Sequence, residues 1–408
     1  MNKRRVINNI GRAAQLIGIK FPHIDPAKLI ALVKKEYDVS DEYNTDYEIA
    51  LSKLVEEATA NPKLTTFGRY ALRNDIINLL HGRFALQKHQ NTHPNNYTNN
   101  ITDPLVIIGL PRTGTTILHS LLALDSEFRA PLVWEFNLAP EPPKANHVDN
   151  ATRIARTQNE IESFKNMVPE MEQIHLYDAT LPQECIMATA MDFNSMYFEV
   201  KYQIPNFQEW YNSSDKKETY LFHKRVLQYL QANVPTEKWL LKTPAFIGEL
   251  PELLSTYPNA KIIHTHRDVK HVLQSVASLY YTLRGAFHRD IDVEELGEEM
   301  IHVWHERLEK CLTFREENSQ YSNQFFDLDF SNFMNDTIGS IKLIYEHFGL
   351  NLSEDTENKM KAFLLNNKRT KTKKVVNVNF GFEEKEEMIN QKFRKYQETY
   401  IKSSNNYE

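Results

Sequence analysis

The residues best placed to do chemistry stand in one short turn, Gly109–Thr116, which reads GLPRTGTT. An apolar run before it, Leu105–Ile108, has the length of a buried strand, and apolar residues recur at helical spacing after it. A tight turn that feeds a helix leaves backbone N–H groups unpaired, at the positive end of the helix dipole. Phosphate and sulfate groups bind to such N–H groups. The turn therefore predicts a site for an anion.

The spacing of this turn invites comparison with the phosphate-binding loop of nucleoside triphosphatases, G-x-x-x-x-G-K-[ST]. The position of the phosphate-binding Lys holds Thr115, whereas a cation, Arg112, lies three residues earlier. The missing Lys weakens the hypothesis of a kinase or NTPase, which stays an alternative. A non-catalytic nucleotide-binding protein is a second alternative, because binding residues alone do not establish turnover.

Two further cations lie at the ends of predicted strands. Lys242 ends the strand of the segment KWLLKTP, just before Pro244, and Arg267 follows the strand Lys261–His266. Ligands of open α/β sheets bind at the carboxyl ends of the strands, which is where both cations are expected. A salt-bridged surface Lys is the ordinary alternative for Lys242. Ser275 lies eight residues after Arg267, two turns along the following helix.

Composition limits the classes of partner. The chain has 408 residues, of which 41% are hydrophobic and 25% charged, as in a globular protein, and its net charge is -6. A negative chain has no global attraction for nucleic acid or anionic membranes. No run approaches membrane-spanning length, and Ile7–Ile19 lacks the apolar core of a signal peptide. Two cysteines, Cys185 and Cys311, are too few for a disulfide framework or zinc cluster, which predicts a cytoplasmic protein.

The pattern of the whole chain predicts an α/β fold, with a P-loop-like parallel sheet flanked by helices and helical additions at the N-terminus and in mid-chain. We expect a helical extension at 1–100, an α/β core at 101–350 that includes a helical insertion at 150–235, and a C-terminal loop and helix at 351–408. The expected helices are Pro26–Tyr37, Asp46–Ala60, Thr65–His89, Asp336–Leu350 and Glu383–Tyr400. The expected strands are Leu105–Ile108, Lys238–Lys242, Lys261–His266 and Gln324–Leu328.

Three separated motifs carry a family resemblance: GLPRTGTT from Gly109, LKTP from Leu241 and HRDVKHVLQS from His266. In this order they resemble the bacterial sulfotransferase family and, more distantly, the tyrosylprotein sulfotransferases. The resemblance is firm over about Pro104 to Leu350. It implies in-line transfer of a sulfuryl group from 3'-phosphoadenosine 5'-phosphosulfate (PAPS) to a hydroxyl or amine of an acceptor.

The same resemblance implies roles for the three cations. Arg112 and Lys242 would be catalytic, with Lys242 neutralising the bridging oxygen as it leaves, and Arg267 with Ser275 would hold the 3'-phosphate of the donor. Because a sulfuryl group carries less charge than a phosphoryl group, these cations suffice without Mg²⁺, and we expect no metal. The residues implied to bind the 5'-phosphosulfate are Pro111, Arg112, Thr113, Gly114, Thr115 and Thr116.

The general base is the point at which the sequence departs from its cytosolic relatives. Cytosolic sulfotransferases have a catalytic His two residues after the Lys that corresponds to Lys242, and Pro244 stands there. Tyrosylprotein sulfotransferases use a Glu shortly after the anion-loop helix, and Glu135 falls in that region with a two-residue shift. Glu135 is therefore the leading base, with a helix cap or a solvated charge as its structural alternative. His175 and Glu184 are alternative bases.

The remaining candidate residues have structural rather than catalytic interpretations. His302, His305 and Glu306 lack the H-E-x-x-H spacing and a third ligand, which indicates a solvated helix face. The basic run Lys368–Lys374 indicates a solvated loop, with closure over the 3'-phosphate as the alternative. Aromatic and Met residues are enriched in 150–235, which fits either a core or a pocket for an apolar, lipid-like acceptor. The acceptor and the oligomeric state are left open.

Overall fold

The computed structural model describes residues 3–16, 21–39, 45–98, 100–170, 178–234, 238–367 and 378–401. They form two compact units, which we call the helical unit and the sheet unit. The helical unit comprises Met1–Asn100, Pro131–Pro235 and Tyr280–Ile291, and the sheet unit comprises Ile101–Ala130, Thr236–Leu279 and Asp292–Glu408. Both units are discontinuous in sequence. The division at about residues 100 and 350 that the sequence suggested stays a prediction.

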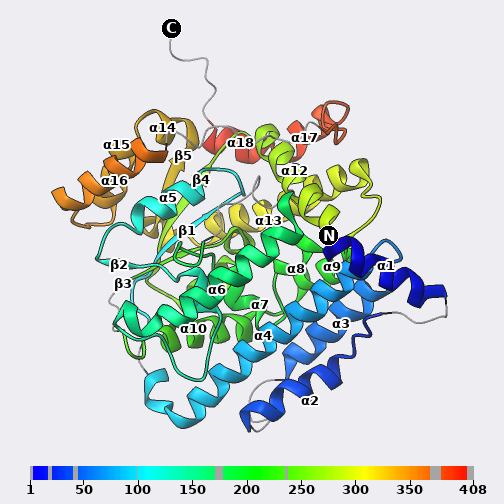
Figure 1. The fold of residues 1–408 in the computed structure, drawn as a ribbon. Coiled ribbons are helices and arrows are strands. Elements are labelled where there is room, and N and C mark those ends of the chain that lie inside the picture. The colour runs from blue at the N-terminus through cyan, green and yellow to red at the C-terminus, as the bar shows by residue number, and fades with distance from the viewer. Residues whose placement is uncertain are drawn as a thin grey trace. The chain divides into compact units, whose positions relative to one another are not determined.

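The helical unit contains α-helices and short 3₁₀ turns, labelled η. Figure 1 shows α2, α3 and α4 lying side by side within it. No helix among the described residues combines the length and the apolar character that a bilayer span requires. The elements of this unit are α1 (Lys3–Leu16), α2 (Pro26–Tyr37), α3 (Asp46–Ala60), α4 (Thr66–Thr92), η1 (Pro94–Tyr97), η2 (Val133–Phe136), α6 (His147–Met167), α7 (Ile186–Ala190), α8 (Tyr197–Lys201), α9 (Pro205–Ser213) and α10 (Lys217–Gln231).

The N-terminal helices confirm the sequence-based predictions. Helices α2 and α3 match their predicted bounds, and α4 runs three residues beyond its predicted end. Helix α2 begins at Pro26, after Asp25, whose carboxylate accepts a hydrogen bond from the Lys28 N–H. Thr65 caps α4 in the same way, through the Gly68 N–H. Side-chain caps at both starts explain why these boundaries could be read from the sequence.

The sheet unit is built on five parallel strands in the order β2-β3-β1-β4-β5. This arrangement, with its flanking helices, confirms the predicted fold class. Its elements are β1 (Leu105–Gly109), α5 (Thr115–Leu122), β2 (Phe128–Arg129), β3 (Lys238–Lys242), η4 (Pro244–Gly248), α11 (Leu250–Thr256), β4 (Lys261–His266), α12 (Val269–Phe287, whose last residues belong to the helical unit), α13 (Val293–Glu317), η5 (Ser319–Gln324), β5 (Phe325–Asp329), α14 (Phe330–Asn335), α15 (Thr337–His347), α16 (Glu354–Asn367), α17 (Glu386–Lys392) and α18 (Arg394–Tyr400).

The central strand β1 is fixed by the burial of its apolar side chains. All five of its residues are buried, as expected for a parallel strand with both faces covered. Leu105 and Ile107 point into one hydrophobic cluster with Leu118 and Leu121 of α5 and Ile341 of α15. Burying each such side chain stabilises the fold by roughly 1.5–3 kcal/mol relative to leaving it exposed. The apolar run therefore fixes β1, and with it the turn that follows.

The C-terminal region departs from its prediction in one respect. A single helix from Glu383 to Tyr400 was expected, whereas the structure has two short helices, α17 and α18, that meet at the buried residue Phe393. Burial of this ring at the break anchors both helices. The basic run Lys368–Lys374 lies outside the described residues.

Candidate active site

The parallel sheet brings the predicted cations to one edge of the sheet unit. Strands β3 and β4 both pair with β1, with Lys242 opposite Ile107 and Thr265 opposite Gly109. Because all three strands run in the same direction, their carboxyl ends share an edge, which is where ligands of such sheets bind. The anion turn follows β1, Lys242 ends β3 and Arg267 follows β4.

The anion turn is held in an unusual backbone conformation. Gly109, Arg112 and Gly114 have φ values of 144°, 70° and 87°, in the region that favours glycine. The Thr113 hydroxyl donates to the Leu110 carbonyl at 2.7 Å and lies 2.6 Å from Thr265 Oγ1. These bonds tie the turn to itself and to β4. They also engage the Thr113 hydroxyl within the protein.

Gly109 provides a test of this geometry. A Cβ at this position would lie 2.3 Å from Thr265 Oγ1 and 2.7 Å from the Thr265 carbonyl. We expect Gly109→Ala to lower the free energy of unfolding by about 2–4 kcal/mol through clash and backbone strain. Chemical denaturation measures the change. Gly349→Ala is the matched control, because Gly349 has a φ of 61° but open space around it, so only about 1–2 kcal/mol is expected. Equal losses in both variants would contradict the close approach.

The arginines and the serine form a contiguous group. Arg112 Nε donates to Ser275 Oγ at 2.9 Å, and Arg267 Nη1 donates to the Arg112 carbonyl at 2.9 Å. The Arg267 guanidinium lies 4.2 Å from the ring centre of Phe330. Burial, and then the positive charge of Arg112, lowers the pKa of Arg267, although a guanidinium stays charged. Two neighbouring cations repel each other, so an anion between them would be strongly favoured.

Lys242 is almost completely buried, with 3% of its surface exposed, and it lies near a histidine that the sequence analysis missed. His119, on α5, is also 3% exposed, and one of its ring nitrogens, Nε2, has no hydrogen-bond partner. Burial, and then the charge of Lys242, lowers the pKa of His119 to about 3. At neutral pH the His119 imidazole is therefore uncharged and adds no second positive charge beside Lys242. The only sequence signal was a polar residue within an apolar helix.

The low pKa of His119 predicts how stability depends on pH. The unfolded chain takes up a proton near pH 6.5, whereas folded His119 does so only near pH 3. Between these values the unfolded state binds more protons, so stability is full above about pH 6.5 and falls as the pH is lowered. From pH 7.5 to 5.5 this histidine removes about 1.4 kcal/mol. In His119→Gln, the drop in the free energy of unfolding between pH 7.5 and 5.5, measured with urea, should be smaller by that amount. The same drop as in the parent protein would contradict the low pKa of His119.

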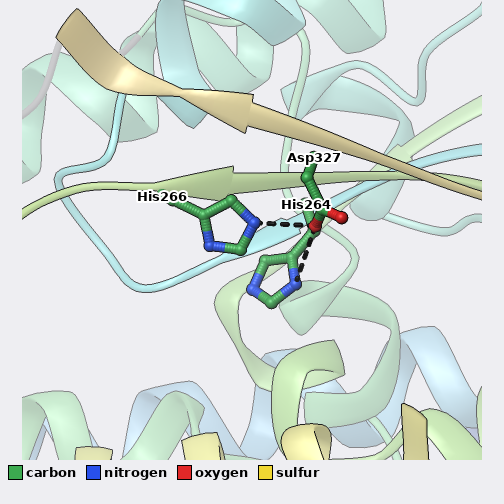
Figure 2. A group of neighbouring side chains, drawn as sticks. All are labelled: His264, His266 and Asp327. Atoms are coloured by element: carbon green, nitrogen blue, oxygen red, sulfur yellow. Dashed lines mark hydrogen bonds and ion pairs between the residues drawn. The ribbon is translucent and has the colours of Figure 1, made fainter. Parts of the chain in front are cut away.

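A second histidine group lies at the end of β4. His266 Nε2 and His264 Nδ1 face the same oxygen of Asp327, at 2.8 and 4.0 Å (Figure 2). These are metal-ligand types. Arg315 binds both oxygens of that carboxylate, however, at 2.7 and 2.9 Å. A guanidinium there repels a divalent cation, so this group is an ion-pair network rather than a metal centre. Burial opposes ionisation of Asp327, but hydrogen bonds from Arg315 and His266 outweigh it and lower the pKa of this carboxylate.

The residues that were predicted to form a solvated helix face, with no metal, lie on α13. His302 is exposed, the His305 ring packs edge-on against Phe393, and Glu306 pairs with Lys310 at 3.1 Å. The solvated-face interpretation is confirmed for His302, while His305 is a packing residue.

The candidate bases Glu135 and Glu184 belong to the helical unit. Glu135 is 4% exposed, and one of its oxygens accepts the Leu132 N–H at 2.8 Å. Residue 132 pairs with Pro182 in an antiparallel bridge, and the Gln183 N–H donates to the Pro131 carbonyl. The bridge holds both glutamates on one local framework, at opposite ends. His175 lies outside the described residues.

Comparison with known proteins identifies the class. The model of the sulfotransferase family matches residues 104–354. The omega-hydroxy-beta-dihydromenaquinone-9 sulfotransferase Stf3 of Mycobacterium bovis is 24% identical over 279 residues, which cover 66% of this chain and 68% of that protein. Sulfotransferase STF9 of Mycobacterium avium has a TM-score of 0.84 at 24% identity, covering 94% of this chain and 99% of its own. STF1 of Mycobacterium tuberculosis has a TM-score of 0.77 at 24% identity, covering 91% and 98%.

The two crystal structures show that the fold is that of sulfotransferases. The family model spans more than half of the sequence, so the chain belongs to the sulfotransferase family. It is a sulfotransferase enzyme, and its family uses PAPS as donor. The kinase and non-catalytic alternatives give way to this assignment.

Proposed function

We propose that this chain binds PAPS at the carboxyl edge of its sheet and transfers the sulfuryl group to a hydroxyl or amine of an apolar acceptor. The observation that carries the proposal is the contact of Arg267 with the Arg112 carbonyl, because it joins the end of β4 to the anion turn of β1. Adenosine 3',5'-bisphosphate carries anions at both ends. Two cationic groups on adjacent strand ends match that distribution of charge.

The 5' end of the donor is assigned to the anion turn. Backbone N–H groups at the start of α5, together with Arg112, would bind the phosphosulfate oxygens, as helix N-termini do. The hydroxyls of Thr115 and Thr116 stand in the first turn of α5, of which Thr116 is exposed. Lys242 would balance the charge that develops on the bridging oxygen as the sulfuryl group leaves.

The 3'-phosphate is assigned to Arg267 and Ser275. The Ser275 oxygen already accepts a hydrogen bond from Arg112 Nε, so the hydroxyl proton is available for a phosphate oxygen. Arg267 is anchored by one nitrogen to the Arg112 carbonyl, which leaves other donors of its planar fork for the phosphate. The connected residues Arg112, Ser275 and Arg267 would thus bind both the 5' and the 3' end of the donor.

Glu135 is assigned as the general base that accepts the proton of the acceptor's hydroxyl or amine. The bases Glu184 and His175 stay alternatives. A lipid-like alcohol is supported by the name of the mycobacterial relative, which acts on a hydroxylated menaquinone. The two cysteines, Cys185 and Cys311, are buried thiols, which fits the cytoplasmic location that we propose. No metal is needed in this scheme.

The test is a pair of measurements on the purified full chain. Adenosine 3',5'-bisphosphate should raise the melting temperature, and ATP should raise it much less. Labelled PAPS with a lipid extract and a panel of long-chain alcohols should yield a labelled product, with turnover that persists in EDTA. Stabilisation by ATP alone, or turnover abolished by EDTA, would count against the proposal.

A further inference from the structure

The C-terminal helix α18 contacts the donor edge of the sheet through two tyrosines one turn apart. The Arg267 N–H donates to Tyr396 Oη at 3.2 Å, and the same hydroxyl lies 3.4 Å from the Arg267 carbonyl, to which it donates. Tyr400 stacks on the neighbouring His266, with ring centres 4.1 Å apart and planes 4° apart. The helix therefore holds two consecutive residues at the end of β4.

The tyrosine contacts lie where the hydrogen-bond ladders of β4 end. The ladder between β4 and β5 ends at His266, opposite Asp329, and the ladder to β1 ends one residue earlier. Arg267 is the first residue beyond both ladders, so the sheet no longer satisfies its backbone. Tyr396, which is only 1% exposed, supplies both hydrogen bonds in place of a strand. One hydroxyl thus fixes the backbone from which the guanidinium extends.

His266 is held from its other side as well. Its Nε2 lies 2.8 Å from Asp327, which Arg315 binds, and the Arg315 guanidinium lies 5.3 Å from the ring centre of Tyr400. The residue before Arg267 is therefore clamped between β5 and α18. On this supported strand end, Tyr396 supplies the side-chain hydrogen bonds to the Arg267 backbone.

We propose that Tyr396 is a positioning residue for the donor's 3'-phosphate: its hydroxyl fixes the Arg267 backbone, so that the C-terminal helix governs selection of 3'-phosphorylated nucleotides. The inference rests on the proposed role of Arg267. A guanidinium that must reach both the Arg112 carbonyl and a phosphate tolerates little movement at its Cα. Loss of the Tyr396 hydroxyl removes the partner of the half-buried Arg267 N–H and lets the strand end shift.

The experiment compares two ligands on the full chain by titration calorimetry. Adenosine 3',5'-bisphosphate has the 3'-phosphate, and adenosine 5'-phosphate lacks it. In Tyr396→Phe, which keeps the ring, we expect the first affinity to fall by about five- to twentyfold and the second to stay within about twofold. The KM for PAPS should rise with little change in kcat, because the 3'-phosphate is bound equally in the ground and transition states.

Thr399→Val is the matched control, since it removes another hydroxyl of α18 that donates only within the helix, to the Lys395 carbonyl. It should leave the ratio of the two affinities unchanged. A partly unfolded sample lowers both affinities together, so the ratio stays informative if Tyr396→Phe folds poorly. Equal effects on both ligands, or no effect on either, would overturn the inference.

Arg267→Ala separates this inference from the proposed function. It should abolish the preference for adenosine 3',5'-bisphosphate, and adding Tyr396→Phe should then change nothing further. If Arg267→Ala retains the preference, the assignment of the 3'-phosphate to Arg267 is wrong. If it loses the preference while Tyr396→Phe keeps it, only the role of Tyr396 is wrong.

Discussion

Lys242→Ala is expected to lower kcat for sulfuryl transfer by about 10²–10³-fold, the range found when one preorganised donor to a developing charge is removed. Lys242 is nearly fully buried at the carboxyl end of β3, so its charge acts in a water-poor setting. The charge on the bridging oxygen develops only in the transition state. We therefore expect kcat and kcat/KM to fall together, while affinity for adenosine 3',5'-bisphosphate changes by less than about threefold.

The matched control for this variant is Lys238→Ala. Lys238 begins the same strand, at the opposite edge of the sheet, and pairs with Glu127 at 3.4 Å. Initial rates with labelled PAPS should be unchanged in this variant, because a surface ion pair contributes little. A rate within threefold of the parent protein for Lys242→Ala would remove Lys242 from the mechanism.

The framework of this site followed from the sequence because its signals are local. Short apolar runs fixed β1, β3 and β4, and parallel pairing then placed the residue after each strand at one edge of the sheet. Helix caps such as Asp25 and Thr65 fixed boundaries for the same reason. The order and parallel direction of β1 and β4 were enough to predict that Arg112 and Arg267 lie close together.

Other features depended on packing between distant segments, which periodicity does not encode. Nothing local marked His119 as the neighbour of Lys242, or Tyr396 as the partner of the Arg267 backbone. The alternation in KIIHTH does place His264 and His266 on one face of β4. Their engagement with Asp327, by contrast, required the pairing of β4 with β5.

Glu135→Gln is expected to lower kcat by about 10²–10⁴-fold, the usual contribution of a general base. The substitution also separates catalysis from structure. Glu135 accepts the Leu132 N–H, and a Gln carbonyl oxygen can accept the same bond, so the local fold and the melting temperature should be kept. Steady-state rates with the acceptor identified by the screen, together with the melting temperature of each variant, test this.

The alternative bases supply the controls for this last experiment. Glu184 lies at the far end of the same bridge and is only partly buried, so Glu184→Gln makes a comparable change of charge on the same framework. If Glu135 is the base, Glu184→Gln and His175→Gln should each retain kcat within about threefold. Should Glu135→Gln stay active while one of these variants loses its rate, the carboxylate of Glu135 serves only as a cap for the turn η2. The general base is then the residue whose substitution lowers kcat, because an amide cannot take up the proton that a base accepts.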